Sequence, residues 1–239
     1  MDFYSSFVQY YDLIFPFRKK TFDFLKSFLS KPTDFILDLG CGTGKLTGAF
    51  AKAGYNSHGF DLDEEMIKFA SEHFPEATLY NKNILQVSEI KQKFELVYST
   101  GNVVSYLAEP ELKLLAKSLF EQITSEGHWI FQTVNWAKFN KNYNVVFPPI
   151  QFEKEKLTFH REYTSTPHQS FVKFFTKLSS GNDVIFSGQS ELFPLLPGNA
   201  ERIFEDAGFK LELVAGDFDG NPYGEKSGAA IYVFKKPAG

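Results

Sequence analysis

The sequence predicts an α/β fold in which a mostly parallel sheet is covered by helices on both faces. Three observations favour this fold class. Short apolar runs of strand length alternate with amphipathic segments of helix length over the first 135 residues. The first run ends in three glycines at alternate positions, Gly40, Gly42 and Gly44. One further helix and two strands close the chain. Strands that alternate with helices are typical of a parallel sheet.

The predicted elements follow from periodicity and from turn and capping residues. Two helical segments are expected within residues 1–30, separated at Pro16. Amphipathic spacing, capping residues and terminal glycines place the later helices at 45–52, 64–73, 109–122 and 198–208. The strands of the main sheet are expected at 35–39, 55–60, 77–80, 94–99, 128–134, 209–215 and 229–234.

The glycine run after the first strand points to a nucleotide. Strand, glycine loop and helix place free backbone N–H groups and a helix N-terminus against a bound ligand. The spacing excludes two familiar loops. A dinucleotide fingerprint that starts at Gly40 needs a glycine at position 45, which is Lys45. A P-loop that ends at Lys45 needs a glycine at position 39 and Ser or Thr at 46, and both are leucines.

The remaining pattern is Asp38-Leu-Gly40-Cys-Gly42-Thr-Gly44. It resembles the first motif of the class I S-adenosylmethionine-dependent methyltransferases. The resemblance implies a Rossmann-like, seven-stranded, mostly parallel sheet with helices on both faces, and S-adenosyl-L-methionine as cofactor. The cofactor contacts that it implies in this loop are Asp38, Gly40, Cys41, Gly42 and Gly44.

A carboxylate stands at the position where a side chain that binds ribose is expected. Asp61 ends the second strand 19 residues after Gly42, close to the ~20 typical of this arrangement. A carboxylate accepts both hydroxyl protons of a ribose in paired hydrogen bonds. Asp63 is expected to be the N-cap of the next helix. The resemblance adds Leu62 and Met66 as contacts of the adenine.

The resemblance implies further site residues at other strand ends. Asn83 and Ile84 follow the third strand and are expected at the adenine. Thr100 and Gly101 follow the fourth strand, where a doubly wound sheet faces its ligand crevice. The run Gly101-Asn-x-x-x-Tyr-Leu resembles the glycine N-methyltransferase-like, small-molecule group, which implies substrate contacts from Asn102 and Tyr106. The Tyr-Asp pair in the N-terminal segment resembles a methyltransferase lid and adds Tyr11 to the cofactor contacts.

The strand–helix alternation stops after the fifth strand. Polar–apolar alternation at 157–163, 170–178 and 184–193 predicts an inserted antiparallel sheet. The resemblance to the small-molecule group implies that an insertion at this point covers the mouth of the active site and selects the substrate. It divides the chain into a methyltransferase domain, 1–136 and 197–239, with 1–30 as a helical lid, and an inserted substrate-lid subdomain, 137–196. Polar residues of the insertion are candidates for substrate contact: His160, Arg161, Tyr163 and His168.

Composition narrows the setting. The chain has 239 residues and a formal net charge of −4, so no overall basic field favours nucleic acid. Its single cysteine, Cys41, allows no intrachain disulfide and favours a reducing compartment. The N-terminal residues lack a secretory pattern, and no apolar run reaches membrane-spanning length. We expect a cytoplasmic protein, a monomer or homodimer, with no metal site and no membrane or nucleic-acid partner.

The expected reaction is methyl transfer to nitrogen or oxygen of a small molecule. Methyl transfer from a sulfonium is an in-line displacement with a neutral leaving group, so alignment of the reactants provides most of the rate. An optional base comes from Tyr106, His160, Asp217 or a water, and the sequence does not choose among them. Alternatives are a protein or RNA methyltransferase, a non-catalytic S-adenosylmethionine-binding module and an NAD-linked dehydrogenase, the last disfavoured by Lys45.

Overall fold

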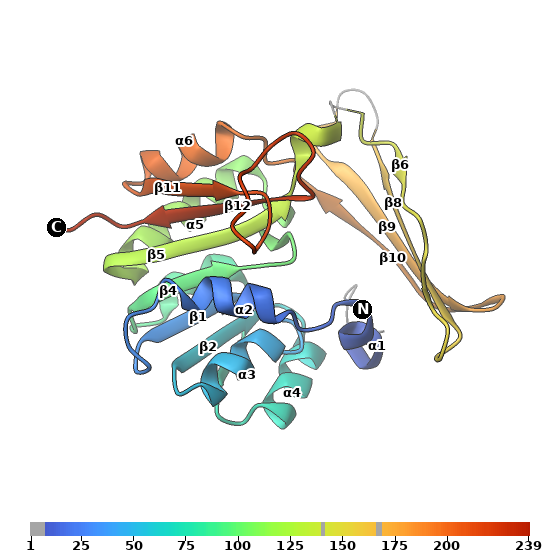
Figure 1. Ribbon diagram of the computed structural model, residues 1–239, viewed down its shortest axis with the longest axis horizontal. Helices are drawn as coiled ribbons and strands as arrows, with labels where there is room; N and C mark the ends of the chain where they lie inside the picture. The colour runs from blue at the N-terminus through green and yellow to red at the C-terminus, as the bar shows by residue number, and fades with distance from the viewer. Residues whose placement is uncertain (1–7, 140–141, 166–168) are drawn as a thin grey trace.

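The protein is built from two sheets, as a computed structural model shows (Figure 1). The structure describes residues 8–139, 142–165 and 169–239. The first sheet has seven strands in the order β11-β12-β5-β4-β1-β2-β3, and the second has the order β10-β9-β8-β6, with β7 also paired to β8. The fold class predicted from the sequence is confirmed.

The helices are α1 (Val8–Ile14), α2 (Lys19–Lys26), α3 (Lys45–Lys52), α4 (Glu64–His73), α5 (Glu109–Gln122) and α6 (Asn199–Asp206), with short 3-10 turns η2 (Ile84–Glu89), η3 (Val103–Tyr106) and η4 (Trp136–Phe139). The strands of the main sheet are β1 (Phe35–Leu39), β2 (Asn56–Asp61), β3 (Thr78–Asn81), β4 (Phe94–Ser99), β5 (Ile123–Val134), β11 (Lys210–Ala215) and β12 (Ala229–Lys235). The strands of the second sheet are β6 (Val145–Val146), β7 (Ile150–Phe152), β8 (Leu157–Thr164), β9 (Val172–Ser180) and β10 (Asp183–Leu192).

The order of the main sheet creates a ligand crevice. Strands β1, β2, β3, β4 and β5 pair in parallel, while β12 pairs antiparallel with both β5 and β11. The chain moves outward from β1 to β3 and then returns to β4 on the other side of β1. Ligands of open α/β sheets bind outside the carboxyl ends of the strands at such a reversal point. The loops after β1 and β4 therefore border the expected site.

Each face of the main sheet has its own apolar core. One face buries Leu37, Val97, Phe131 and Tyr232 beneath α5, α6 and η2. The other face includes Ile36, Tyr98 and Ile231, and it packs against Leu25 of α2 and Phe50 of α3. Side chains of alternate residues in one strand thus pack into opposite cores, as in a sheet covered by helices on both faces.

The fifth strand differs from its prediction. It begins at Ile123 and not at 128, so Gly127 lies inside the strand and not in a turn before it. The pairing with β4 shifts register between Phe94 and Leu96, and Glu126 has a φ of 67°. An added Cβ at Gly127 would lie 2.9 Å from the Glu95 carbonyl oxygen, so the glycine permits a bulge in a continuous strand.

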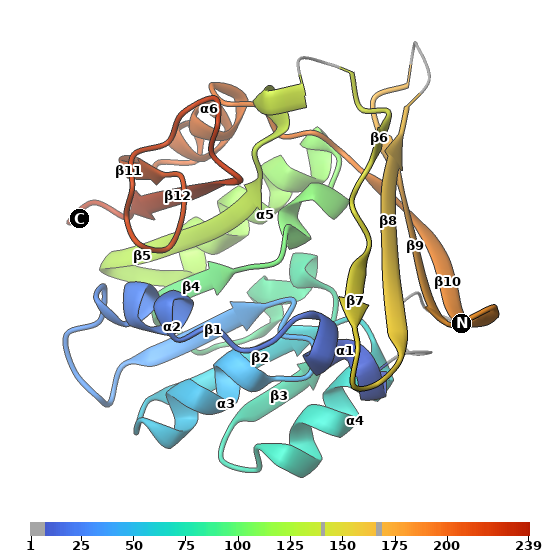
Figure 2. The same cartoon turned by 45° about the vertical axis from the view of Figure 1, so that its right-hand side comes forward.

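The second sheet stands beside the main sheet, and α1 lies against its end (Figures 1 and 2). Residues of α1, including Ile14, Tyr10 and Leu13, pack on Phe159 of β8 and Leu178 of β9. The predicted inserted antiparallel sheet is present, between η4 and α6. Residues 1–7, which carry the first part of the predicted N-terminal helix, and His168 lie outside the described residues.

A buried carboxyl group joins β1, α3 and β4. Asp38 is 3% exposed, and its Oδ2 accepts hydrogen bonds from Thr47 Oγ1 at 2.9 Å and from the Tyr98 hydroxyl at 3.0 Å. Burial raises the pKa of Asp38 to about 7, because the two hydrogen bonds offset only part of the lost hydration. The unfolded chain would ionise this group near pH 4.

Asp38→Asn tests the effect of this carboxyl group on stability. Between about pH 4 and pH 7 the folded protein holds a proton that the unfolded chain has released, so the Asp38 contribution to stability falls as pH rises. The amide cannot ionise but resembles the protonated carboxyl group in shape. We expect equal unfolding free energies within about 1 kcal/mol at pH 4, and a variant more stable than the parent at pH 8, by more than about 1 kcal/mol. Urea unfolding at both pH values measures this, and a constant difference would contradict it.

Gly48→Ala tests the packing of α3 on the chain after α4. An added Cβ at Gly48 would lie 2.1 Å from a ring carbon of Phe74. Helix propensity alone would make the alanine stabilising by roughly 0.5–1 kcal/mol. We expect the clash to outweigh it, with a loss of about 1–3 kcal/mol in urea unfolding. In a Phe74→Ala background the same substitution should be stabilising, and a stabilising effect in the parent would rule the clash out.

Candidate active site

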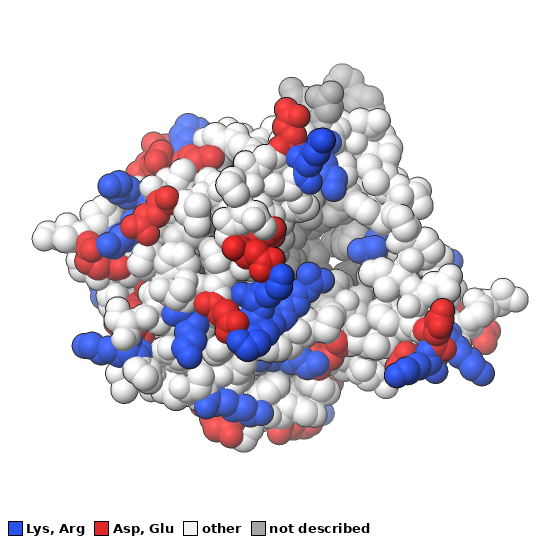
Figure 3. Space-filling model, viewed as in Figure 1, with Lys and Arg blue, Asp and Glu red and all other residues white. Residues whose placement is uncertain are grey.

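A large cavity lined by described residues lies at the carboxyl ends of the parallel strands. It has a volume of about 1430 Å³, and its walls come from α1 and the start of α2, the glycine loop, the ends of β2 and β4, and the loop before β12. Figure 3 shows the surface hollowed between the main body and the second sheet, with basic side chains gathered along the body side of the hollow. The reversal point of the main sheet is thus open to ligands.

Most of the predicted cofactor residues line this cavity. They are Tyr11, Asp38, Gly40, Cys41, Gly42, Asp61, Leu62, Met66, Asn83, Ile84, Thr100 and Gly101. Gly44 does not line it. Gly44 has a φ of 74° as the N-cap of α3, and an added Cβ would lie 2.8 Å from Ala70. The third glycine therefore allows α3 to approach α4 closely.

The glycine loop is held by the end of β2. The N–H groups of Gly40 and Cys41 both donate to the Phe60 carbonyl at 2.8 Å. Gly42 has a φ of 54°, and its N–H donates to Asp61 Oδ2 at 2.7 Å. An added Cβ at Gly42 would lie 3.1 Å from the Tyr11 ring. A side chain at this position would strain the backbone and press on that ring, so the loop needs glycine.

Asp61 is fixed by the two loops that it joins. Its Oδ1 accepts from the Asp63 N–H at 3.0 Å, and its Oδ2 accepts from Gly42. Each carboxylate oxygen keeps capacity for a second hydrogen bond. Burial raises the pKa of Asp61 because the hydrogen bonds do not fully replace water. The predicted N-cap is confirmed, since Asp63 accepts from the N–H groups of Glu65 and Met66 at 3.0 and 3.1 Å.

The wall expected at the adenine is partly apolar. Ile84 is 8% exposed and Met66 is 1% exposed, while Leu62 is 62% exposed at the rim. Asn83 is the N-cap of η2, and its Oδ1 accepts from the Leu85 N–H at 2.9 Å. A base contact from this amide therefore stays a prediction, with one acceptor position already used.

The two predicted substrate residues in the loop after β4 differ in their placement. Tyr106 lines the cavity, but Asn102 does not. Asn102 has a φ of 69°, and its Oδ1 accepts from Ser105 Oγ at 2.7 Å and from the Val134 N–H at 3.0 Å. These bonds tie the loop after β4 to the end of β5. Asn102 therefore holds the loop that borders the site and does not itself line the cavity. A contact between Asn102 and the substrate stays a prediction.

Gln132 is a site residue that the sequence analysis missed. It lies near the carboxyl end of β5 and lines the cavity, and its Oε1 accepts from the Gly101 N–H at 2.8 Å. Gln132 directly follows the apolar run Trp129-Ile130-Phe131 and stands near the strand end that faces the ligand, and this position could have indicated it.

The N-terminal helix is attached to the glycine loop. Asp12 accepts from Thr43 Oγ1 at 2.6 Å and forms an ion pair with Lys45 at 3.2 Å. The neighbouring Tyr11 lies over Gly42, and burial raises the pKa of its phenol, with the carboxylate of Asp61 adding to the effect. Tyr11 is therefore neutral at physiological pH.

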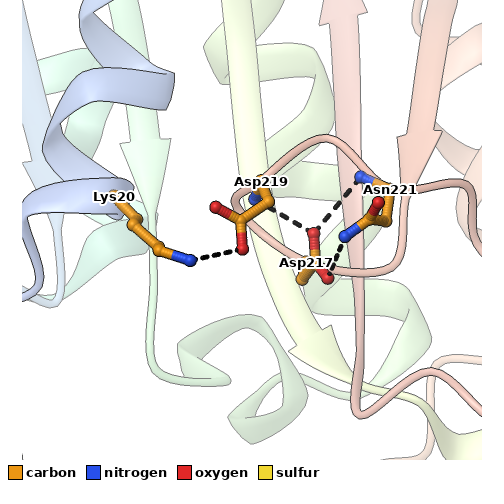
Figure 4. Close-up of polar contacts among 4 residues, drawn as sticks. All are labelled: Lys20, Asp217, Asp219 and Asn221. Carbon is orange, nitrogen blue, oxygen red and sulfur yellow. Dashed lines mark hydrogen bonds and ion pairs between the residues drawn. The ribbon is translucent and has the colours of Figure 1, made fainter.

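A second rim element is the loop before β12. Asp217 accepts from the N–H groups of Asp219 and Asn221 at 3.0 and 3.2 Å and from Asn221 Nδ2 at 2.8 Å (Figure 4). Lys20 at the start of α2 forms an ion pair with Asp219 at 2.7 Å (Figure 4). These hydrogen bonds lower the pKa of Asp217, which makes it a weak base. Lys20, Asp217, Asp219 and Asn221 all line the cavity.

Three predicted substrate residues lie on β8 and do not line the cavity: His160, Arg161 and Tyr163. Tyr163 is 6% exposed and packs among Trp136, Phe147 and Phe174. Arg161 shares that face of the strand, because side chains alternate along β8. His160 projects from the opposite face.

Two negative findings apply to the described residues. They contain no group of three or more His, Cys, Asp or Glu side chains placed to hold a metal ion. Among the helices described, none has both the length and the apolar character needed to cross a membrane.

Comparison with known proteins supports this geometry. Residues 36–127 match the methyltransferase domain family. A ubiquinone biosynthesis O-methyltransferase of Hydrogenovibrio crunogenus is 27% identical over 155 residues, 63% of this chain and 61% of that enzyme. A dTDP-3-amino-3,4,6-trideoxy-alpha-D-glucopyranose N,N-dimethyltransferase of Streptomyces venezuelae is 33% identical over 76 residues, 32% of each chain. The chain thus spans less than two thirds of either relative.

The fold is shared over its full length with a solved methyltransferase. The CcbJ methyltransferase of Streptomyces caelestis superposes with a TM-score of 0.84 at 17% identity, and the match covers 100% of both chains. The likeness therefore includes the second sheet as well as the main one. The domain match, the shared fold and the glycine-loop cavity agree: residues 36–127 match the methyltransferase domain family, and the chain has the fold of a solved methyltransferase.

Proposed function

We propose that this protein transfers the methyl group of S-adenosylmethionine to an amine or hydroxyl group of a small molecule. The observation that carries the proposal is one cavity in which the glycine loop, two buried carboxyl groups and an apolar wall meet. Its volume of about 1430 Å³ exceeds the roughly 300–1,000 Å³ of single-ligand pockets. The space suits a cofactor and a second ligand together.

The charges of the cavity suit this cofactor. Asp38 and Asp61 both line it, and neither forms an ion pair with a basic side chain of the described residues. S-adenosylmethionine carries a positive sulfonium and a positive ammonium group. A cation near a buried carboxyl group favours its ionised form. The bound cofactor would therefore provide the positive counter-charge that Asp38 and Asp61 do not receive from a basic side chain.

Roles for the other residues follow from their placement. Asp61 is fixed with acceptor capacity to spare and would hold the ribose hydroxyls. Ile84, Leu62 and Met66 would form the adenine wall. The N-terminus of α3 would provide backbone N–H groups for the carboxylate end of the cofactor, as helix N-termini do for anions generally. Tyr11 would cover the loop from the other side.

The chain contributes position more than acid or base chemistry. The bound cofactor supplies the reactive methyl group. Tyr11 has a raised pKa and stays neutral, while Asp217 has a lowered pKa and is a weak base. These residues can orient an acceptor and exclude water, which is sufficient where effective molarity provides the rate. An acceptor amine would then bind neutral or lose its proton to water.

We infer that the second sheet, within residues 137–196, covers the acceptor, while residues 1–136 and 197–239 hold the cofactor. The α1 contacts with both the glycine loop and the second sheet support this division. The two relatives described above are named for a ubiquinone precursor pathway and for an amino sugar, both small molecules. We therefore expect a small acceptor and no nucleic-acid partner, in a cytoplasmic monomer or homodimer.

The test of this function has two stages. Calorimetric titration with S-adenosylhomocysteine, with NAD and ATP as controls, should show selective binding of the homocysteine nucleoside. Transfer of labelled methyl from S-adenosylmethionine should then be measured with panels of small amines, phenols and acids, and with RNA and protein extracts. Absence of nucleoside binding by folded protein would refute the proposal. Label in macromolecules alone would refute the small acceptor.

Asp61→Ala should weaken the binding of S-adenosylhomocysteine by about 1–3 kcal/mol, the scale of hydrogen bonds to a charged group. Part of this loss comes from the Gly42 N–H, which loses its acceptor. The matched control is Asp206→Ala on α6, an exposed aspartate outside the cavity lining. Calorimetry measures both variants, with circular dichroism as the folding check. Unchanged affinity in folded Asp61→Ala protein would exclude the ribose assignment.

A further inference from the structure

Arg161 occupies an unusual place on the second sheet. It lies in the middle of β8, on the face that also carries Phe159 and Tyr163. Phe159 belongs to the apolar cluster beneath α1, and Tyr163 belongs to a second cluster around Trp136. Arg161 therefore separates two apolar clusters on one face of the sheet.

The charge of Arg161 is not neutralised by the described residues. Its guanidinium lies between the rings of Phe147 and Phe159, 5.5 and 5.9 Å from their centroids. It forms no ion pair there, and its one hydrogen bond runs from Nη2 to the Pro148 carbonyl at 3.3 Å. Burial lowers the pKa of Arg161, and no carboxylate opposes that shift. Ring faces attract a cation but accept no hydrogen bond from Nε, which is buried without a partner.

Two hydroxyl groups on the same face are also without partners. Thr176 on β9 stands directly opposite Arg161 in the antiparallel pairing, and Ser190 on β10 lies one row further along. Thr176 Oγ1 and Ser190 Oγ are buried and make no hydrogen bond. The described residues hold six buried side-chain N or O atoms without a partner, and three of them lie here. Such atoms are rare in folded proteins, so their concentration indicates a missing polar group.

The polar row does not line the cavity, but aromatic contacts connect it to the cavity on two sides. Phe159 contacts Phe15, with ring centroids 6.1 Å apart, and Phe15 lines the cavity. On the other side, Tyr163 is close enough to Tyr106 for that phenol to raise its pKa, and Tyr106 lines the cavity too. An acceptor that extends from the cavity toward the second sheet would meet Arg161 between two apolar surfaces.

We propose that Arg161, with Thr176 and Ser190, binds a carboxylate of the methyl acceptor, so that the substrate is an apolar molecule with one acidic group. The proposal rests on the methyltransferase function proposed above. A planar guanidinium and two hydroxyl donors match the two oxygens of a carboxylate. A single cation also suits a monoanion better than the dianion of a phosphate monoester. The aromatic rows on either side suit a ring or hydrocarbon body.

The experiment uses simple probes, because the natural acceptor is not needed. Binding of benzoate, benzamide and phenyl phosphate to protein saturated with S-adenosylhomocysteine should be measured by calorimetry or ligand-observed NMR. The variants are Arg161→Met, which keeps an apolar stem between the rings, and Arg161→Lys, which keeps the charge without the planar fork. The matched control is Lys177→Met on β9, an exposed cation on the opposite face of the same sheet.

We expect the parent protein and Lys177→Met to bind benzoate at least 10-fold more tightly than benzamide. Arg161→Met should lose this preference, and Arg161→Lys should lose most of it, while affinity for S-adenosylhomocysteine stays unchanged in all four proteins. Equal binding of benzoate and benzamide by the parent, a preference that survives in Arg161→Met, or tighter binding of phenyl phosphate would each overturn the proposal. If the parent protein does not bind S-adenosylhomocysteine, this result would instead count against the methyltransferase function itself.

Discussion

The hydrogen bond from the Gly42 N–H to the Asp61 carboxylate is the constraint on which the site depends. It joins the loop after β1 to the end of β2, two strands that are adjacent and parallel. The bond requires Gly42 to take a positive φ, and it leaves no room for a side chain beneath Tyr11. One interaction thus determines the shape of the loop, the orientation of the carboxylate and the position of the N-terminal helix above both. A change at any of the three would move the other two.

The second constraint is the burial of charge without a counter-charge. Asp38 and Asp61 share the cavity with no basic partner among the described residues, and Arg161 lies on the facing sheet with no acidic one. Each arrangement is unfavourable in the free protein, since burial disfavours an isolated charge. The carboxyl groups of the cavity and the guanidinium of the second sheet would suit the cationic cofactor and the acidic acceptor proposed above. Binding sites commonly hold such strain, and ligands relieve it.

Much of the main sheet could be predicted from the sequence, because local signals agree there. The capping Asp63, the amphipathic spacing of 109–122 and the apolar run 94–99 gave boundaries that match α4, α5 and β4. The predicted start of β5 was wrong, because the sequence of the bulge at Glu126 and Gly127 resembles that of a turn. Site residues held by motif spacing, such as Asp61, lie in the cavity, whereas Asn102 and Gly44 support it from outside. Lys20 and Asp219 depend on long-range pairing, for which a single sequence carries no local signal. The row Arg161, Thr176 and Ser190 depends in the same way on strand register.

The attachment of α1 has a consequence for the order of events in a catalytic cycle. This helix contacts the glycine loop through Asp12 and packs on the second sheet through Ile14. The described part of this helix, Val8–Ile14, is held by these tertiary contacts, because short helices have little stability of their own. Its position therefore depends on both surfaces at once. Withdrawal of α1 would uncover the glycine loop and an apolar face of the second sheet in a single movement, so the two parts of the site would open together.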